Sequence, residues 1–370
     1  SSNSINQEID TNGVKVIRLV SSPDSIIANI SDIVSEVEYI PLQKTTNSHI
    51  DVIDKIMIRR NKIYVSTVNT LQCFNNKGRY LYGLYGNAKG KVQTPIVVYD
   101  FDISSDDSKL IVLSSDKILE FNNTDTGFVF MKSIKLGSIS PTKLDFVPGT
   151  NNILISSISV YGLHMLINIY GDTINIKPNY NKKKYIIRSG LPNEIIHFKF
   201  DNDLYFKDKF SDTVFYVDSE SNKFTQSFIF DSYLSSTTDE NINDPEYLKY
   251  LPRLVNVFEV SRYLFYTYTF INSFYNVFYD KYEDGKFEID QKNGSLKDDI
   301  SGGPNFSPIF CSEGKYISWI SAKALKKYTK SEEFRIMKVK NPKKKENLEE
   351  LATNLKEADN PVIIIVTPKE

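Results

Sequence analysis

Short apolar runs recur along the whole chain, and most of them alternate polar and apolar residues or are rich in β-branched and aromatic ones. Clusters of Asn, Asp, Gly and Ser separate these runs, as turns separate short strands. Such runs include KIYVSTV, KLIVLSS, NILISSISV, DLYFKD, TVFYVD, YLFYTYTF, NVFYDKY, YISWIS and VIIIVT. The pattern predicts an almost all-β chain, whose sheet edges must be closed, stacked or repeated radially.

Helical periodicity is confined to two segments. In residues 239–254, the apolar positions Tyr247, Leu248, Leu251 and Leu254 share one helical face, and in residues 345–358 leucines recur at helical spacing. We expect a short helical insertion in the first segment. The second predicts a C-terminal helix that ends before Pro361.

A turn of the form Asn/Asp-x-x-Gly/Asn-basic-aromatic follows a strand-like run at five places. Its Gly or Asn supplies a positive φ, which costs most other residues about 1–2 kcal/mol. The five positions, 44 to 63 residues apart, are Gly78, Gly127, Gly171, Asn222 and Gly285. Four strands with their turns need about 40–50 residues, so the period predicts a six-bladed β-propeller.

Each unit is expected to form a four-stranded blade, in which the repeated turn joins the last two strands. Residues 38–42 are expected to pair with the last blade and remove its open edge. The opening residues 1–29 are polar and small, so we interpret them as a tether and residues 30–370 as one propeller domain. The predicted blades cover residues 52–97, 98–137, 142–178, 195–230, 253–290 and 305–370.

The charge balance argues against nucleic-acid binding. With 45 basic and 46 acidic residues the net charge is −1, so there is no global positive field to hold a polyanion. Cys73 and Cys311 lack a CxxC neighbour and the three histidines are far apart, so no metal site is predicted. We favour two buried free thiols over a disulfide. No apolar run approaches the roughly 20 residues of a transmembrane helix.

The glycine-rich stretch GRYLYGLYGNAKGKVQTP, residues 78–95, resembles a phosphate-binding loop at first sight. A P-loop needs four residues between its glycines and then Lys-Ser/Thr, whereas Gly86 and Gly90 have three between them and Lys91 precedes a valine. No helix N-terminus follows to hold a phosphate. We therefore interpret the stretch as a strand connection and expect no cofactor.

The aromatic run of residues 263–282 offers candidate ligand contacts. Exposed rings stack on sugar rings for about 0.5–1.5 kcal/mol per contact. In a strand, Tyr266 and Tyr268 share one face, and Tyr263 and Phe265 share the other. Rings on both faces also fit the packing of a blade between its neighbours, which we favour.

Catalytic signatures are absent from the sequence. There is no Gly-x-Ser-x-Gly motif. His164 lies in VYGLHMLINI, which predicts a strand interior facing the core or the channel; if it faces the channel, it is a candidate ligand contact. Adjacent carboxylates such as Asp106 and Asp107 point to opposite faces of a strand, so they do not form a two-carboxylate site. We predict no catalytic residues.

Five segments in order resemble one known family: ISDIVSEVEYIPLQKT (30–45), FNNKGRYLYGLYGNAKGKVQTP (74–95), DTVFYVD (212–218), LKDDISGG (296–303) and EADNPVIIIVTPK (357–369). The chain looks like a member of the six-bladed β-propeller family abundant in Bacteroides-type bacteria, related in shape to NHL-repeat propellers. The resemblance extends from about residue 30 to the end. The loop at Gly86, Gly90 and Pro95 departs from the family pattern, because its acidic and aromatic elements are missing.

The resemblance implies export, because members are typically periplasmic or outer-membrane lipoproteins. The opening SSNS would then follow a removed, lipidated cysteine, and a lipid anchor would be the sole link to a membrane. The resemblance also places Asp299 near a blade entry, which makes it a candidate ligand contact. The alternative for Asp299 is a turn-capping role, which we favour.

These observations favour a non-enzymatic, monomeric binding or scaffold propeller that presents a channel mouth or loop face to a glycan, a peptide or an envelope protein. The alternative is a carbohydrate-active hydrolase or lyase, which predicts two carboxylates and a His or Tyr converging at the channel mouth with shifted pKa values. A purely structural partner in an envelope complex would instead show a large apolar patch.

Overall fold

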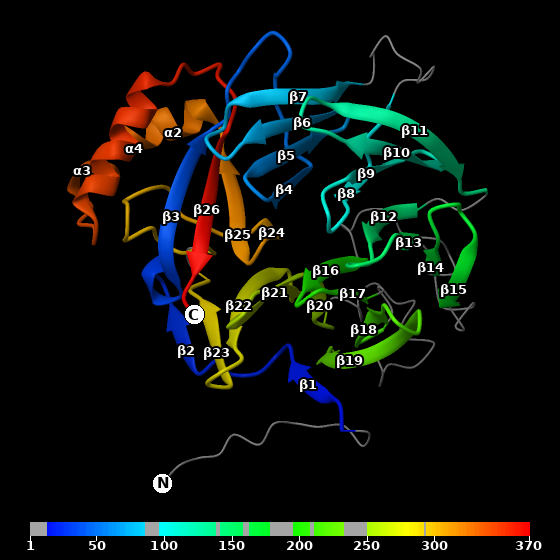
Figure 1. Cartoon of the computed structure of the whole chain (residues 1–370). Coiled ribbons are helices and arrows are strands. Elements are labelled where there is room, and N and C mark those ends of the chain that lie inside the picture. The colour runs from blue at the N-terminus through cyan, green and yellow to red at the C-terminus, as the bar shows by residue number, and fades with distance from the viewer. Residues whose placement is uncertain are drawn as a thin grey trace.

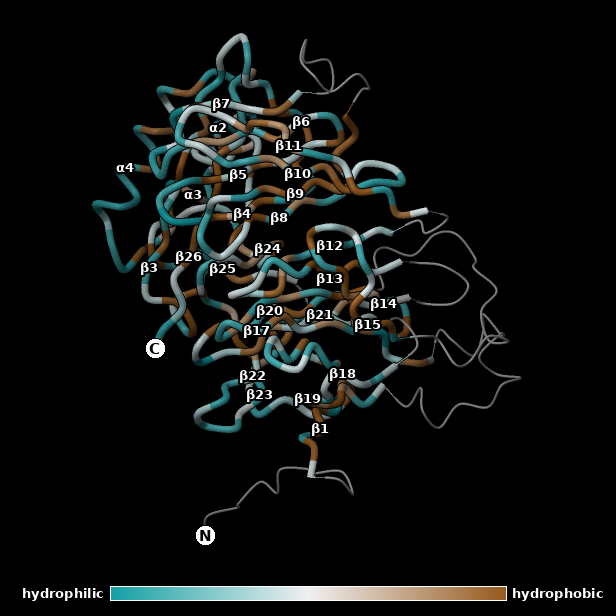
Figure 2. The backbone as a smooth tube through the Cα atoms, turned by 45° about the vertical axis from the view of Figure 1, so that its right-hand side comes forward, coloured by the Kyte–Doolittle hydropathy of each residue, from teal (hydrophilic) through white to brown (hydrophobic). Residues whose placement is uncertain are grey.

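Six β-sheets stand around a central axis, like the blades of a propeller (Figure 1). They belong to a computed structural model of the chain, which describes residues 13–85, 96–137, 141–157, 163–177, 195–207, 211–232, 250–291 and 294–370. The predicted six-bladed β-propeller is confirmed. Stretches of apolar residues follow the strands and hydrophilic residues gather at the turns (Figure 2).

Each of the first five blades is an antiparallel meander that begins with its inner strand. The strands of blade one are β4 (Lys55–Arg59), β5 (Lys62–Thr67), β6 (Thr70–Asn75) and β7 (Tyr80–Tyr85). Those of blade two are β8 (Asp100–Ile103), β9 (Lys109–Ser114), β10 (Lys117–Asn123) and β11 (Phe128–Lys135). Blade three has β12 (Pro141–Phe146), β13 (Ile153–Ser157), β14 (Leu163–Ile167) and β15 (Thr173–Lys177).

Blade four contains β16 (Ile196–Phe200), β17 (Asp203–Lys207), β18 (Thr213–Asp218) and β19 (Lys223–Asp231). Blade five contains β20 (Arg253–Glu259), β21 (Tyr263–Phe270), β22 (Ser273–Asp280) and β23 (Gly285–Ile289). Blade six combines both ends of the chain: β24 (Phe310–Ser312), β25 (Lys315–Ile320), β26 (Val362–Pro368) and, outermost, β3 (Val34–Pro41). Strand β3 runs antiparallel to β26, with Tyr39 opposite Ile364.

The opening residues are not a simple tether. Strand β1 (Lys15–Arg18) adds to the outer edge of blade four in parallel with β19, and β2 (Ser25–Ile27) adds in the same way to β23 of blade five. Leu19 and Ile27 are buried there, within the short apolar runs VKVIRLV (14–20) and SIIANI (25–30). The predicted boundary at residue 29 therefore falls after two strands that already belong to the propeller, just before the 3₁₀ turn η1 (Ile30–Asp32).

The repeated turns join the last two strands of blades one to five, as predicted. Gly78, Gly171 and Asn222 have positive φ angles of 77°, 93° and 56°. In blade five the prediction is wrong by one residue, because Asp284 has the positive φ of 53° and Gly285 already belongs to β23. A short polar side chain tolerates this conformation, so glycine is not needed there.

Three helices separate β25 from β26 and cover the outside of blade six (Figure 1). The predicted C-terminal helix is α4 (Pro342–Asn354), which begins at a Pro after the N-cap Asn341 and ends four residues earlier than expected. Two shorter helices, α2 (Ala322–Thr329) and α3 (Glu332–Ile336), were not predicted, because each has few apolar positions. The helical insertion expected at 239–254 lies almost wholly outside the described residues.

The core consists of the packed faces between blades. Tyr266 and Tyr268 of β21 pack toward blade four, beside Phe230, whereas Phe265 packs toward blade six, beside Tyr316. Both faces of this aromatic strand are thus used for packing between blades, as the alternation predicted. The inner strands remain to surround the axis.

Candidate ligand-binding channel

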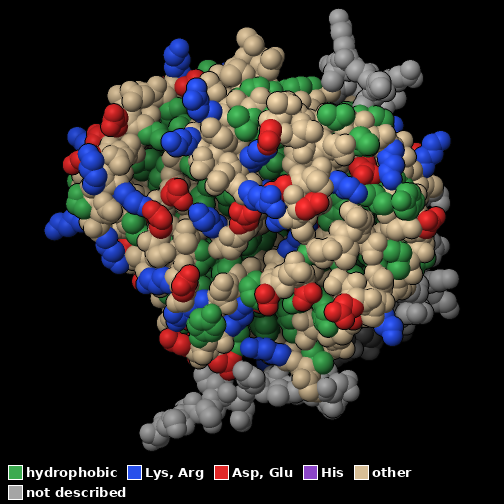
Figure 3. All heavy atoms as spheres, viewed as in Figure 1, with side chains coloured by type: hydrophobic (Ala, Val, Ile, Leu, Met, Phe, Trp, Pro, Cys, Tyr) green, Lys and Arg blue, Asp and Glu red, His purple; other side chains and the backbone are tan. Residues whose placement is uncertain are grey.

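A cavity of about 1850 Å³ runs along the propeller axis. It is lined by the inner strands of all six blades: β4, β8, β12, β16, β20 and β24. We call the end at which these strands begin the entry mouth, and the end at which they finish the exit mouth. Figure 3 shows one face of the molecule, on which acidic and basic side chains are interspersed and not gathered by sign.

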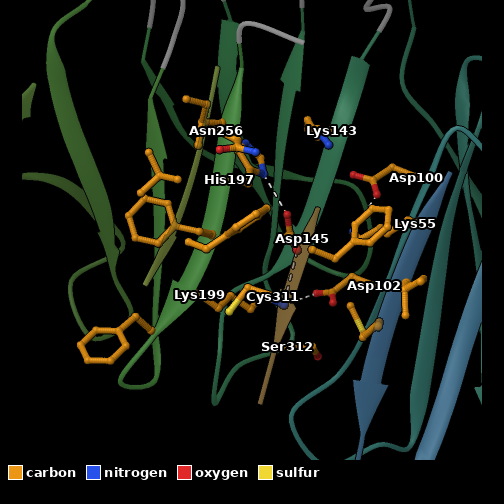
Figure 4. Close-up of a pocket in the computed structure, with 18 of the residues that line it drawn as sticks. Lys55, Asp100, Asp102, Lys143, Asp145, His197, Lys199, Asn256, Cys311 and Ser312 are labelled. Carbon is orange, nitrogen blue, oxygen red and sulfur yellow. Dashed lines mark hydrogen bonds and ion pairs between the residues drawn. The ribbon is translucent and has the colours of Figure 1, made fainter. Parts of the chain in front are cut away.

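Alternation along the inner strands decides which side chains reach the cavity. In β8, Asp100 and Asp102 line the channel while Phe101 is buried between blades. The same alternation gives Lys143 and Asp145 in β12, and His197 and Lys199 in β16 (Figure 4). Successive strand residues point to opposite faces, so each inner strand supplies polar groups to the channel and apolar ones to the core.

Two lysines and three aspartates form a network within the channel. The ammonium of Lys55 donates to Asp100 Oδ1 at 2.7 Å and to the carbonyl of Phe101 at 2.8 Å. The ammonium of Lys199 contacts Asp102 Oδ2 and lies 3.5 Å from Asp145 Oδ1. The network crosses from blade one to blade four, so it ties inner strands together across the axis.

The network shifts the pKa values of its members in opposite directions. Burial raises the pKa of Asp102 above its usual value against the opposing effect of Lys199, and the Asp145 carboxylate raises it further. Burial also acts to raise the pKa of Asp145, but Lys55, Lys199 and the hydrogen bond from His197 outweigh it and lower that pKa. The neighbouring carboxylates raise the pKa of Lys55 against the effect of its burial. The channel therefore stabilises ammonium groups.

A hydrogen-bonded chain leads from the channel into blade three. His197 Nδ1 lies 2.9 Å from Asp145 Oδ2, His197 Nε2 lies 2.8 Å from Ser156 Oγ, and Ser156 Oγ lies 2.6 Å from His164 Nδ1. With neutral rings, His197 donates to Asp145 and accepts from Ser156, which in turn accepts from His164. Ser156 is 1% exposed and does not line the cavity. The order Asp-His-Ser is that of a hydrolase triad, but this hydroxyl has no access to a substrate.

Two inner strands carry β-bulges at the entry mouth. The register shifts between Pro141 and Lys143 in β12, and between Leu254 and Asn256 in β20. Bulges of this kind redirect side chains beside functional sites. Among the described residues, Thr142 Oγ1 and Asn256 Oδ1 have no hydrogen-bond partner although both atoms are buried, and both residues line the channel. Lys143, His197 and Asn256 lie at one level of it (Figure 4).

The entry mouth has an apolar lip around this polar interior. Val68, Tyr99 and Ile309 line it and are 56%, 59% and 44% exposed. The exposed carboxylates of Asp54 and Asp116 line it as well. Such a lip, with polar groups behind it, suits a ligand that has both apolar surface and hydrogen-bonding groups.

None of the four candidate residues from the sequence lines the channel. Tyr266 and Tyr268 are buried between blades four and five, and His164 is buried beside Phe206. Asp299 accepts hydrogen bonds from the backbone and hydroxyl of Ser31 at 3.0 and 2.6 Å, and it pairs with Lys340. These contacts lower the pKa of Asp299 against the opposing effect of its partial burial. It therefore joins η1 to the helical segment.

The turn-capping role expected for Asp299 belongs to its neighbour. Asp298 is fully buried and accepts hydrogen bonds from the backbone of Ile300 and Ser301, from Gly303 N and from the Tyr39 hydroxyl. Two adjacent carboxylates thus have separate structural partners, because they point in different directions. Neither one faces the channel.

Cys73 is buried and Cys311 is half-buried in the channel wall, and both are free thiols. Within the described ranges, no three His, Cys, Asp or Glu side chains are placed to hold a metal ion. The same part of the chain contains no helix long and apolar enough to span a membrane.

The channel residues were missed, although the sequence carries a signal for them. Three of the six inner strands contain a charged or polar pair at positions i and i+2 around an apolar residue: D-F-D at 100–102, K-L-D at 143–145 and H-F-K at 197–199. Alternation alone is equally typical of a strand with one face in solvent. What distinguishes a channel from a surface is that these pairs occur in the first strand of three successive blades.

Comparison with known proteins adds to this geometry. The family model described as "Domain of unknown function (DUF4934)" matches residues 14–367. Among solved structures, that of a Bacteroides fragilis protein inferred to be exported is similar with a TM-score of 0.70 and 18% identity, covering 96% of this chain and 100% of that one. At this identity the similarity concerns the fold. No match was found among curated proteins.

Two further structures have weaker similarity. U3-55K has a TM-score of 0.45 and 11% identity, with 92% of this chain and 99% of that one covered. The WD40 domain of Neurospora crassa Pan2 has a TM-score of 0.39 and 6% identity, with 64% of each chain covered. Neither bears on the function.

Proposed function

We propose that this chain, which belongs to the DUF4934 family, is a non-enzymatic binding propeller that holds a polar ligand at the entry mouth of its channel. The predicted membership of a six-bladed propeller family with Bacteroides relatives is confirmed by the family match and the structural neighbour. Export of this chain is part of the proposal and is supported by the description of that neighbour.

The observation that carries the proposal is the pair of bulged inner strands. Thr142 and Asn256 present buried oxygens without partners in the described residues, from blades three and five, on either side of His197 in blade four. An unpaired buried polar atom costs about 1–3 kcal/mol, so a ligand that hydrogen-bonds these atoms recovers that cost. The ligand classes that fit are a glycan, a peptide or an exposed segment of an envelope protein.

The charged groups deeper in the channel favour binding over catalysis. Asp102 and Asp145 both contact the ammonium of Lys199, which occupies the space between them that a substrate would need. Ser156, whose hydroxyl is hydrogen-bonded to His197, is shielded from the cavity. The groups that could do chemistry are thus already paired with each other.

A carbohydrate-active hydrolase or lyase is the second candidate, and one observation favours it. Asp102 and Asp145 both contact the Lys199 ammonium, and their pKa values are displaced in opposite directions, as are those of the acid and the base in many glycosidases. Displacement of Lys199 by a substrate would be required for this function.

One experiment separates the two candidates. The purified chain is applied to an array of oligosaccharides and peptides, and every binder is then incubated with the protein and analysed for cleavage products. Saturable binding without cleavage supports the binding propeller. Release of new reducing ends or unsaturated sugars at enzymatic rates, abolished in an Asp145→Asn variant that is shown to be folded, would establish the enzyme instead.

A further inference from the structure

The charges that line the channel are unequal. Eight acidic and four basic residues line it, which gives a difference of four negative charges with His197 neutral. The chain as a whole has a net charge of −1, so acidic residues are concentrated in the channel. A ligand that carries negative charge is therefore disfavoured there, and a cation is favoured.

Most of the lining cations are already occupied. Lys55 pairs with Asp100, Lys199 with Asp102 and Asp145, and Arg59 with Asp107. Lys143 is the remaining basic residue of the lining, and no acidic partner for it exists among the described residues. At the entry mouth these pairs leave the carboxylates of Asp54 and Asp116 against the ammonium of Lys143, an excess of one negative charge. Three other acidic lining residues, Asp201, Glu259 and Glu313, lie at the exit mouth.

Two carboxylates at the entry mouth have no basic partner in the described part of the chain. Asp54 directly precedes β4, and Asp116 lies in the turn between β9 and β10; both are exposed and both line the channel. Deeper in the channel, Asp102 is fully buried, and its Oδ1 atom has no hydrogen-bond partner among the described residues. Its carboxylate is closed to solvent, so it acts on a cation at the mouth through its charge and not by direct contact.

The channel already holds ammonium groups of its own. The Lys55 ammonium lies between a carboxylate and a backbone carbonyl, at 2.7 and 2.8 Å. At the lip, the ring of Tyr99 offers an aromatic face that attracts a cation. The side chain of Val68 offers an aliphatic surface for the carbon skeleton next to an amine. The same surroundings would receive an ammonium supplied from outside.

We propose that the channel selects ligands that carry a primary ammonium group, with Asp54 and Asp116 receiving it at the entry mouth and Asp102 lying beyond them. This inference rests on the proposed binding function and names its ligand class. Amino sugars with a free amine and lysine side chains share this chemistry. Uronic acids and other anionic glycans are excluded by it.

The test is isothermal titration calorimetry with four probes at pH 7 and low salt. A glucosamine tetramer and Nα-acetyl-lysine amide, which keeps its side-chain amine free, represent the two sources of amine. The N-acetylglucosamine tetramer has the same sugar skeleton without the charge, and the galacturonate tetramer has the opposite charge. We expect one or both amines to bind and the galacturonate tetramer not to bind.

Variants at the entry mouth identify the residues. Asp54→Asn with Asp116→Asn should weaken amine binding about fivefold to tenfold and reduce its salt dependence, because two partly screened charges are removed. Lys143→Met should strengthen it by a few fold. Both changes lie on exposed or half-exposed side chains, so the fold is expected to be retained.

The outcomes separate this inference from the proposed function. Equal binding of the acetylated and free-amine tetramers overturns the amine selectivity and leaves the binding propeller standing. Failure of both amines to bind at millimolar concentration, or unchanged affinity in the double variant, also overturns the inference. The binding function is decided separately, by the array of oligosaccharides and peptides.

Discussion

The imidazole of His197 in blade four joins the carboxylate of Asp145 in blade three, with Nδ1 and Oδ2 2.9 Å apart. Both side chains are nearly inaccessible to solvent, and Lys199 contacts the same aspartate. The contact therefore holds two inner strands together at the channel wall. It makes Asp145 a structural residue as well as part of the channel chemistry.

Substitution of Asp145 and of Asp102 should affect stability with opposite pH trends. The pKa of Asp145 is lowered in the folded state, so its contribution is present above about pH 4, the ordinary value, and is lost as the pH falls further. Asp145→Asn should thus lower the free energy of unfolding by about 3 kcal/mol at neutral pH, and by less in acid.

For Asp102 the sign is reversed. Its folded pKa is raised, so the cost of its buried charge appears as the pH rises above about 4. Asp102→Asn should therefore become less destabilising between pH 4 and pH 7. Chemical denaturation of both variants across this range checks the prediction, and parallel trends would contradict it.

Gly303 is required because Tyr39 lies against it. A Cβ at position 303 would lie 1.7 Å from the Tyr39 hydroxyl oxygen and 2.9 Å from Asp298 Oδ2. Gly303→Ala should therefore cost about 1–3 kcal/mol of unfolding free energy, because strand β3 must shift on blade six. Tyr39→Phe is the control, since it removes only the hydrogen bond to Asp298 and should cost about 1 kcal/mol. Equal stabilities of Gly303→Ala and wild type in urea denaturation would show that the contact is not tight.

Lys286 fastens the opening segment to blade five. Its ammonium donates to the carbonyls of Leu19 and Ser21 at 2.9 and 3.1 Å. Lys286→Met should accelerate hydrogen exchange in β1 and β2, because the segment that joins them loses its anchor. Lys281→Met is a matched control, as Lys281 pairs with Glu259 and does not contact this segment. Similar exchange in both variants would refute the anchoring role.

Cys311 should report on the state of the channel. It lines the cavity, whereas Cys73 is fully buried, and burial, with a contribution from Glu259, raises the pKa of Cys311 to about 12. A small maleimide should therefore react slowly with Cys311, faster as the pH rises, and before it reacts with Cys73. Mass spectrometry of the labelled protein checks the order. Ligand in the channel should slow the reaction, whereas faster labelling of Cys73 would contradict the assignment.

The sequence was sufficient for most of the architecture. The repeated turns and short strands predicted six blades, and alternation in residues 263–270 predicted rings on both faces of a blade. These features are local, since each depends on residues a few positions apart. The parallel addition of β1 and β2 was not predicted, because runs of four and three residues do not show which blade edge they join.

The channel could not be predicted from local pattern, because it depends on residues in six different blades. Tyr266 and Tyr268 were chosen for their composition, yet they are buried by neighbouring blades that the sequence does not place. Thr142 and Asn256 become distinctive through β-bulges, and a bulge shows only when the partner strand is known. Lys143, Asp145 and His197 resemble ordinary surface positions until their strands are known to be innermost.

The central claim is that the entry mouth binds a ligand through Thr142 and Asn256. The most direct measurement is the affinity of the strongest array binder, by calorimetry, for wild type, for Thr142→Val combined with Asn256→Leu, and for Tyr266→Phe as a control outside the channel. Loss of two hydrogen bonds, at roughly 1 kcal/mol per bond, predicts a dissociation constant at least tenfold larger for the double variant and an unchanged one for the control. Unchanged affinity in a folded double variant would contradict the claim.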